Sequence, residues 1–160
     1  MEIERKYLID ATKLPFSPED YPVHHIEQGY LCTEPVVRIR KDNEDYFLTY
    51  KSKGLMSREE YNLPLTKEAY GHLKSKVDGH IISKKRYVIP LALFIMQSTY
   101  SDLKIELDIF SEDLQGLLLA EVEFPDEKSA LSFVPPAWFG KDVTFSSEYH
   151  NSNLSQRTVL

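Results

Sequence analysis

The sequence predicts a mainly β fold of the α+β class, an antiparallel sheet or barrel accompanied by a few helices. Segments in which apolar and polar residues alternate dominate the 160 residues, and only two stretches have helical spacing. Turn signals such as Asp42-Asn43 and Gly54 separate the strand candidates. Many consecutive strands with few helices indicate antiparallel pairing, not alternating βαβ units.

The strands are expected at regular intervals along the chain. They cover residues 2–9, 25–32, 35–41, 45–53, 56–63, 80–89, 92–100, 103–110 and 117–124, with a short one near 143–146. Pro64 and Pro90 fall at strand ends, where a missing backbone N–H is tolerated.

Two helices are expected between the strands. Thr66 can cap a helix that runs to about residue 77, and Gly79 then ends the helical pattern. Asp126 can cap a second helix that runs to about residue 133, before the double proline at 135 and 136.

Composition excludes several classes of protein. The net charge of −6 and the pI near 5.4 argue against nucleic-acid binding through a basic surface, although a locally basic cavity is still allowed. Cys32 is the single cysteine, so neither an intrachain disulfide nor a Cys-based zinc site is expected. No apolar run approaches the ~20 residues of a membrane helix, and charge from the second residue onward argues against a secretory signal. We therefore expect a cytoplasmic protein that does not bind membranes.

The charged residues are sorted by face. Residues two apart in a strand point the same way, and seven of the expected strands place two or more ionisable groups on one face. Like charges recur at this spacing in the carboxylate pairs Glu2/Glu4, Glu106/Asp108 and Glu121/Glu123 and the cation pairs Arg38/Arg40 and Lys84/Arg86. A solvated sheet face is the simpler interpretation of each strand alone. Mixed signs would suit such a surface better than these like-charged pairs do.

The pairs also have a chemical interpretation. Paired carboxylates are hard oxygen ligands for Mg²⁺ or Mn²⁺, and paired Arg and Lys side chains clamp phosphate groups. If the sheet closes so that these faces meet, one lumen holds both kinds of group. A metal-bound polyphosphate is the ligand that would use both.

Eight motifs follow one another along the chain. They are Glu2-x-Glu4-x-Lys6, Val37-Arg38-Ile39-Arg40, Leu48-Thr49-Tyr50-Lys51, Arg58-x-Glu60-Tyr61, Lys84-x-Arg86-Tyr87, Ile105-Glu106-Leu107-Asp108-x-Phe110, Leu119-Ala120-Glu121-Val122-Glu123, and Val143-Thr144 followed by Tyr149-x-Asn151-x-x-Leu154. With these motifs the sequence resembles the CYTH superfamily, also called triphosphate tunnel metalloenzymes, over residues 2–154. A lone ExExK pattern is unspecific, whereas eight motifs in order are highly specific.

Two features depart from the family pattern. Asn62 stands where the second Glu of an R-x-E-x-E strand is common. The His-Phe element that precedes ExExK in class IV adenylate cyclases is absent, which counts against cyclase activity.

The resemblance implies a single domain over residues 1–160, a closed eight-stranded antiparallel barrel that forms a tunnel, with helices packed outside. It implies metal-dependent hydrolysis of inorganic triphosphate with Mg²⁺ or Mn²⁺. Class IV adenylate cyclase or thiamine triphosphatase activity is an alternative, and so is a non-catalytic module that binds polyphosphate or nucleotides. The expected partner is a small molecule that contains triphosphate, and assembly as a homodimer stays open.

The resemblance also implies roles for individual residues. Phosphate would be bound by Lys6, Arg38, Arg40, Lys51, Arg58, Lys84 and Arg86. Metal would be bound by Glu2, Glu4, Glu121 and Glu123, with Glu106 and Asp108 as further ligands or as orienting groups. The expected catalytic residues are Lys6, Glu4 and Glu123, without a choice of general base. Glu60 and Tyr149 are expected to line or support the site, and Asn151 to secure the C-terminal helix.

Overall fold

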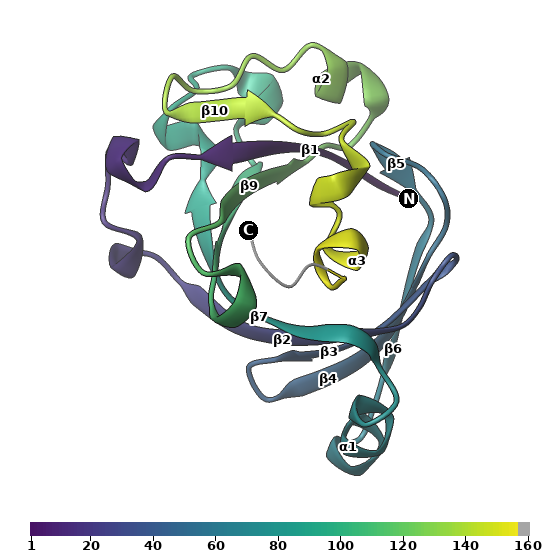
Figure 1. Ribbon diagram of the computed structural model, residues 1–160. Coiled ribbons are helices and arrows are strands. Elements are labelled where there is room, and N and C mark those ends of the chain that lie inside the picture. The colour runs from purple at the N-terminus through teal and green to yellow at the C-terminus, as the bar shows by residue number, and fades with distance from the viewer. Residues whose placement is uncertain (157–160) are drawn as a thin grey trace.

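In a computed structural model, which describes residues 1–156, the strands form one antiparallel sheet that curls into a nearly closed barrel (Figure 1). The last four residues of the expected 1–160 domain lie outside the described part. The mainly β architecture expected from the sequence is confirmed. None of the helices within residues 1–156 has the length and apolar character needed to cross a membrane.

The strands match most of the expected segments. They are β1 (Glu2–Ile9), β2 (Val23–Thr33), β3 (Val36–Asp42), β4 (Asp45–Lys51), β5 (Ser57–Arg58), β6 (Glu60–Pro64), β7 (Asp78–Pro90), β8 (Lys104–Phe110), β9 (Leu118–Glu123) and β10 (Phe139–Asp142). The helices are α1 (Lys67–Lys74), α2 (Glu127–Leu131) and α3 (Asn151–Leu154).

The barrel closes through the first strand. Neighbouring strands follow the order β10-β1-β9-β8-β7-β2-β3-β4-β6, and β5, which directly precedes β6 in the chain, pairs with β1. This seam is short, because Glu2 pairs with Arg58 and Ile3 pairs with Ser57. Gly54 leads into the seam with a φ of 138°, and a Cβ there would collide with the carbonyl oxygen of Ser57. The turn before the seam therefore requires glycine.

The main apolar core lies outside the barrel wall. Ile3, Tyr7 and Val122 belong to this core, and the segments around α2 and β10 cover it with Phe133 and Trp138. The charged residues that alternate with Ile3, Tyr7 and Val122 therefore face the lumen. The lumen beside β1 and β9 can be polar because the apolar side of the wall has its own outer layer.

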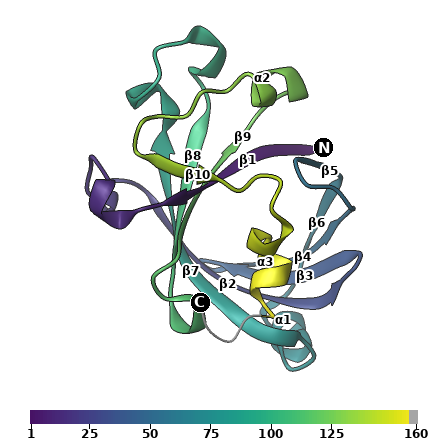
Figure 2. The ribbon, with the colours of Figure 1, turned by 45° about the horizontal axis from the view of Figure 1, so that its top comes forward.

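A second apolar cluster fills one end of the lumen. Leu119, Ile82 and Tyr30 point inward there and pack around Leu154 of α3. In both views α3 lies inside the ring of strands (Figure 1, Figure 2). The backbone N–H of His80 on β7 donates to the carbonyl of Ser155, 2.6 Å away, which ties the end of α3 to the wall. Helices were expected outside the barrel, and α3 departs from this expectation because Leu154 needs the apolar end of the lumen.

Both expected helix caps are confirmed. The Thr66 hydroxyl accepts a hydrogen bond from the N–H of Ala69 at 3.0 Å, and the Asp126 carboxylate accepts one from Ser129 at 2.7 Å. The helices are shorter than expected, since α1 ends at Lys74 and α2 at Leu131.

Two expected strands are wrong. Residues 92–100 form turns of 3₁₀ helix, η3 (Leu91–Leu93) and η4 (Ser98–Tyr100), because their apolar side chains join the outer core and do not extend the sheet. Phe94, for example, packs on Trp138 with ring centroids 5.3 Å apart.

The short strand expected at 143–146 is instead β10, which ends at Asp142. The chain bends directly after it, because the Asp142 carboxylate accepts a hydrogen bond from the N–H of Thr144 at 2.9 Å.

Candidate active site

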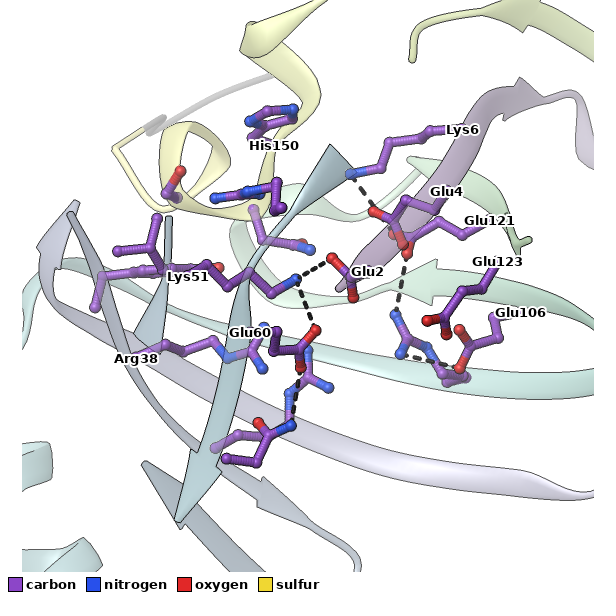
Figure 3. A pocket seen from close by; sticks show the side chains of 18 of the residues that line it. Glu2, Glu4, Lys6, Arg38, Lys51, Glu60, Glu106, Glu121, Glu123 and His150 are labelled. Atoms are coloured by element: carbon purple, nitrogen blue, oxygen red, sulfur yellow. Dashed lines mark hydrogen bonds and ion pairs between the residues drawn. The ribbon is translucent and has the colours of Figure 1, made fainter. Parts of the chain in front are cut away.

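A cavity of about 410 Å³ occupies the lumen (Figure 3). Charged side chains from opposite walls point into it. They are Glu2, Glu4, Lys6, Arg38, Arg40, Lys51, Arg58, Glu60, Arg86, Glu106, Glu121 and Glu123, and all twelve belong to the residues expected from the sequence. The remaining lining residues are Met1, Tyr30, Val36, Asn62, His150, Asn151 and Ser152.

Strand register brings these charges together. On β1 and β9, Glu4 lies opposite Glu123 and Lys6 lies opposite Glu121. On β8 and β9, Glu106 lies opposite Glu121. Each strand contributes charges at every second position, so directly paired residues point into the same cavity.

Lys84 and Asp108 do not line this cavity. The Lys84 ammonium lies 2.7 Å from the Asp108 carboxylate, and both side chains have no exposed surface. Burial lowers the pKa of Lys84 to about 7, although the Asp108 charge opposes this effect. Lys84 and Asp108 therefore engage each other behind the cavity wall, and the expected phosphate contact by Lys84 and metal-ligand role of Asp108 stay predictions.

Arg86 is held by three carboxylates. Its Nε and Nη2 donate to the two oxygens of Asp108 at 2.7 Å and 2.9 Å, and its Nη1 lies 3.2 Å from Glu106. Nη2 also lies 3.8 Å from Glu121. Burial would lower the pKa of Arg86, but the charges of Asp108 and Glu106 raise it well above its ordinary value. Asp108 therefore fixes the orientation of the Arg86 guanidinium.

Three arginines face the cavity without a carboxylate partner. Within residues 1–156 no ion pair joins Arg38, Arg40 or Arg58 to an acid. The nearly buried Arg38 donates to the Thr49 hydroxyl at 3.2 Å, while its Nε has no hydrogen-bond partner. Burial and the neighbouring charges of Arg38 and Arg86 lower the pKa of Arg40. This cluster of uncompensated cations favours an anion in the cavity.

The acids near β1 and β9 repel one another. Burial, together with the charges of Glu121 and Glu2, raises the pKa of Glu4 well above its usual value. Burial also opposes ionisation of Glu121, but Lys6 and Arg86 outweigh it and hold the pKa of Glu121 well below normal. Burial and the charge of Glu106 raise the pKa of Glu123. The repulsion would be relieved by a cation between these groups.

Glu2 on β1 and Glu60 on β6 both form ion pairs with Lys51 of β4. The Lys51 ammonium lies 2.9 Å from Glu2 and 3.9 Å from Glu60. Burial dominates at Glu2 and raises its pKa. Glu60 is less buried, and its contact with Glu2 and the charge of Lys51 lower its pKa to about 2. Glu60 therefore supports the site as an ionised group near neutral pH.

The donor set fits a divalent cation in its chemistry. Carboxylate oxygens suit Mg²⁺ and Mn²⁺. The buried Oε1 of Glu121 has no hydrogen-bond partner in the protein and lies 3.6 Å from the Lys6 ammonium, so its lone pairs are open to a cation. Within the described residues no group of three or more His, Cys, Asp or Glu side chains is gathered tightly enough to form a complete metal site. The ligands would have to converge on the ion when it binds.

The sequence profile of the CYTH domain matches residues 1–130. The chain belongs to the CYTH family. It is 36% identical over 157 residues to an inorganic triphosphatase of Nitrosomonas europaea, with 96% of each chain covered. It is 34% identical over 160 residues to an inorganic triphosphatase of Acetivibrio thermocellus, with 96% of this chain and 92% of that protein covered.

Solved structures agree with this assignment. The crystal structure of an inorganic triphosphatase superimposes with a TM-score of 0.71 at 31% identity, covering 100% of this chain and 97% of that one. A Hippeastrum adenylyl cyclase candidate, described with a dominant triphosphatase activity, superimposes with a TM-score of 0.61 at 15% identity, covering 82% and 83%. The latter similarity concerns the fold alone.

This CYTH chain has site residues that the sequence patterns missed. Gln28 is fully buried, and its Oε1 accepts a hydrogen bond from Arg40 Nε at 2.8 Å. Tyr30 lines the cavity two residues further along β2. Gln28 and Tyr30 are two residues apart and so share the inward face of β2, which the sequence could have indicated. The search was for charged pairs, however, and neither residue carries a charge. His150 lines the cavity from the segment before α3, where alternation gives no guidance.

Tyr149 and Asn151 hold the end of the lumen. The carbonyl of Tyr149 accepts from Lys6 Nζ at 3.3 Å, while its side chain packs against the inner apolar cluster. Asn151 begins α3, as expected for a residue that secures this helix, and also lines the cavity. Its Oδ1 accepts from Lys84 Nζ at 3.5 Å. Asn62 donates to Glu60 at 3.0 Å, so the departure from R-x-E-x-E preserves the orientation of Glu60.

Proposed function

We propose that this chain hydrolyses inorganic triphosphate with the help of a divalent metal ion. The observation that carries the proposal is one cavity in which unpaired Arg38, Arg40 and Arg58 face mutually repelling carboxylates. A polyanion in the cavity would neutralise the charge of the arginines, and a divalent cation bound to that polyanion would neutralise the charge of the acids. The names of the two relatives with at least 34% identity support the same substrate.

The cations of the cavity would hold the phosphate chain. Arg38, Arg40 and Arg58 offer guanidinium groups suited to paired contacts with phosphate oxygens. Lys6 completes the wall near Glu121, at 3.6 Å. Burial would lower the pKa of Lys6, but Glu121 and Glu4 raise it, so this ammonium stays charged and does not act as a base. Lys51 and Arg86 add charge from two further strands.

Glu2, Glu4, Glu121 and Glu123, with Glu106 nearby, would hold the metal ion. A bound divalent cation would neutralise charge on the phosphates and lower the pKa of a coordinated water. The chain itself would position the substrate and exclude competing geometries, which is the larger part of phosphoryl-transfer catalysis. Glu4 and Glu123 lie opposite each other across β1 and β9, so both could orient a water held at the metal.

The lining residues favour an inorganic substrate. Among the described residues of the cavity, Tyr30 and His150 carry the aromatic rings, and Tyr30 is almost fully buried. A purine or a thiazolium would therefore find little aromatic surface for stacking. This favours hydrolysis of triphosphate over cyclisation of ATP or hydrolysis of thiamine triphosphate.

Phosphate release measured with Mg²⁺ and then Mn²⁺ tests the proposal. The substrates are tripolyphosphate, ATP, thiamine triphosphate and pyrophosphate, with Glu121→Gln as the disabled variant and Glu44→Gln, on an exposed turn, as its control. We expect release from tripolyphosphate with wild type and Glu44→Gln and a loss of at least 100-fold with Glu121→Gln. Tripolyphosphate binding without release from any substrate would establish a binding module instead, and cyclic AMP from ATP would establish a cyclase.

A further inference from the structure

Gln28 of β2 is an uncharged side chain that holds one of the cavity arginines. It pairs with Arg40 on β3 and with Ile82 on β7, so the three side chains share the inward face of the wall. Gln28 has no exposed surface, and its Oε1 accepts a hydrogen bond from Arg40 Nε at 2.8 Å. Ile82 is also buried, so the carboxamide lies between an apolar neighbour and a guanidinium.

The orientation of the Gln28 carboxamide follows from this contact. Arg40 Nε carries a hydrogen and can only donate, so the amide oxygen must face it and the amide nitrogen must face away. Within residues 1–156 that buried nitrogen has no hydrogen-bond partner. An apolar side chain of similar length would avoid the cost of an unpaired buried donor. The benefit of glutamine at this position therefore lies in the oxygen that faces Arg40.

The contact leaves the outer edge of the Arg40 guanidinium open. Among the described residues the Arg40 side chain has no further hydrogen-bond partner, so Nη1 and Nη2 are both available to a ligand in the cavity that Arg40 lines. Two parallel N–H groups of an arginine match two oxygens of one phosphate. Arg86 differs, because Asp108 and Glu106 accept hydrogen bonds from all three of its nitrogens.

The partner of Arg40 is neutral although the surroundings are cationic. Burial and the nearby charges of Arg38 and Arg86 lower the pKa of Arg40 to about 9. A carboxylate at position 28 would offset this repulsion while accepting the same hydrogen bond. It would also neutralise the guanidinium before any phosphate arrives. An amide oxygen instead orients the guanidinium and leaves its positive charge for the ligand.

We propose that Gln28 is a positioning residue for substrate binding, whose amide oxygen holds the Arg40 guanidinium with Nη1 and Nη2 open to a phosphate group and does not neutralise it. This role rests on the proposed function only in taking a phosphate anion as the occupant of the cavity. Affinity and stability are then opposed at position 28. The neutral side chain favours anion binding, whereas an acid there would make the empty barrel more stable.

Gln28→Glu tests this opposition, because it keeps the size of the side chain and the acceptor oxygen but adds a negative charge. We expect KM for tripolyphosphate to rise roughly 10-fold with kcat changed less than about 3-fold, and the melting temperature without ligand to rise. If Gln28 only filled space, the added buried charge would lower the melting temperature instead. Gln115→Glu, at an exposed position, is the matched control and should change none of these quantities.

Gln28→Met removes the acceptor oxygen and keeps the length of the side chain. The guanidinium of Arg40 is then no longer held, so we expect KM for tripolyphosphate to rise roughly 3- to 10-fold. The melting temperature should not show the increase expected for Gln28→Glu, because no negative charge is added. A KM equal to that of wild type in Gln28→Met would contradict the positioning role.

Calorimetric binding of tripolyphosphate in EDTA separates this role from the proposed function. If wild type binds tripolyphosphate but hydrolyses no substrate, the proposed function fails, while weaker binding by Gln28→Glu with a higher melting temperature still supports the role of Gln28. Unchanged affinity or a lower melting temperature in Gln28→Glu would overturn that role whatever the hydrolysis assay gives. Absence of tripolyphosphate binding by wild type would overturn both.

Discussion

The guanidinium of Arg86 and the carboxylate of Asp108 face each other across β7 and β8 in a two-pronged ion pair, with N–O distances of 2.7 Å and 2.9 Å. Asp108 has no exposed side-chain surface, and Arg86 reaches the cavity. The acid therefore lies behind the arginine and fixes the direction of its fork. A buried pair of this kind specifies geometry more than it stabilises the fold.

Asp108→Asn tests this arrangement. Removing the charge leaves Arg86 and Lys84 buried around a neutral amide, and loss of one partner of a buried pair costs about 3–5 kcal/mol of unfolding free energy. Urea denaturation measures this loss. Asp113→Asn, which breaks a half-exposed contact with His80, is the matched control and should cost less than about 1 kcal/mol. Equal losses of unfolding free energy in the two variants would contradict the idea that the buried charges of Arg86 and Lys84 depend on Asp108.

Arg38 and Arg5 offer a contrast between the two faces of the wall. Arg38 points into the cavity and lacks an acidic partner, whereas Arg5 on the outer side donates to Asp142 and to the carbonyl of Ala130, both at 2.6 Å. We expect Arg38→Gln to weaken tripolyphosphate binding by about 2 kcal/mol, roughly 30-fold, with little loss of stability. Arg5→Gln should lower the melting temperature and leave KM unchanged. If Arg38→Gln lowered only the melting temperature and Arg5→Gln raised only KM, the assignment of Arg38 to the cavity face and Arg5 to the outer face would be contradicted.

Strand alternation was sufficient to predict the inward face of the wall. Glu4, Arg38 and Arg86 all point into the cavity because a period of two is imposed by the backbone and needs no tertiary information. Alternation gives the face of a residue, but it does not give depth along the barrel. Asp108 and Lys84 share this inward face with the cavity residues and are nevertheless covered, since they lie nearer to the end that α3 fills.

Residues outside regular strands could not be predicted in this way. His150 and Asn151 reach the cavity from the segment at α3, whose place is set by burial of Leu154 inside the lumen. The strand expected at residues 92–100 was wrong for a related reason. Their apolar run is continuous, and a continuous run does not distinguish a strand from turns that pack on an outer core.

We expect Glu4→Gln to have a higher unfolding free energy than wild type and a lower rate of phosphate release. Burial and the charges of Glu121 and Glu2 make the Glu4 carboxylate unfavourable in the metal-free protein, so a neutral amide of the same shape should raise the unfolding free energy by about 0.5–2 kcal/mol. The same variant should lose metal-dependent phosphate release. Denaturation in EDTA and the release assay measure the two effects on one preparation.

Metal addition supplies the control for Glu4→Gln. Mg²⁺ should raise the melting temperature of wild type by mass action and should raise that of Glu4→Gln less, because one ligand has been removed. A variant that is less stable than wild type in EDTA would contradict the repulsion between these acids.

His150 gives a pH dependence with a defined sign. Burial and the charges of Lys6 and Arg58 lower the pKa of its imidazole to about 4, below the ordinary value of 6.5. Between these two values the unfolded chain binds more protons than the folded one, so the unfolding free energy falls as pH decreases from 6.5 to 4 and is unaffected by this group above 6.5. His150→Gln lacks this proton uptake. Its unfolding free energy should therefore fall less than that of wild type across the same window, as measured by urea denaturation at half-unit steps of pH.

Tripolyphosphate should weaken the effect of His150. The bound anion offsets the charges of Lys6 and Arg58, which are part of the cause of the lowered pKa, so the imidazole accepts a proton more readily in the complex. The difference between wild type and His150→Gln should then shrink when the titration is repeated in EDTA with saturating tripolyphosphate. Sulfate at equal ionic strength controls for screening. Parallel curves for wild type and variant in the absence of ligand would show that His150 does not sense the cations of the cavity.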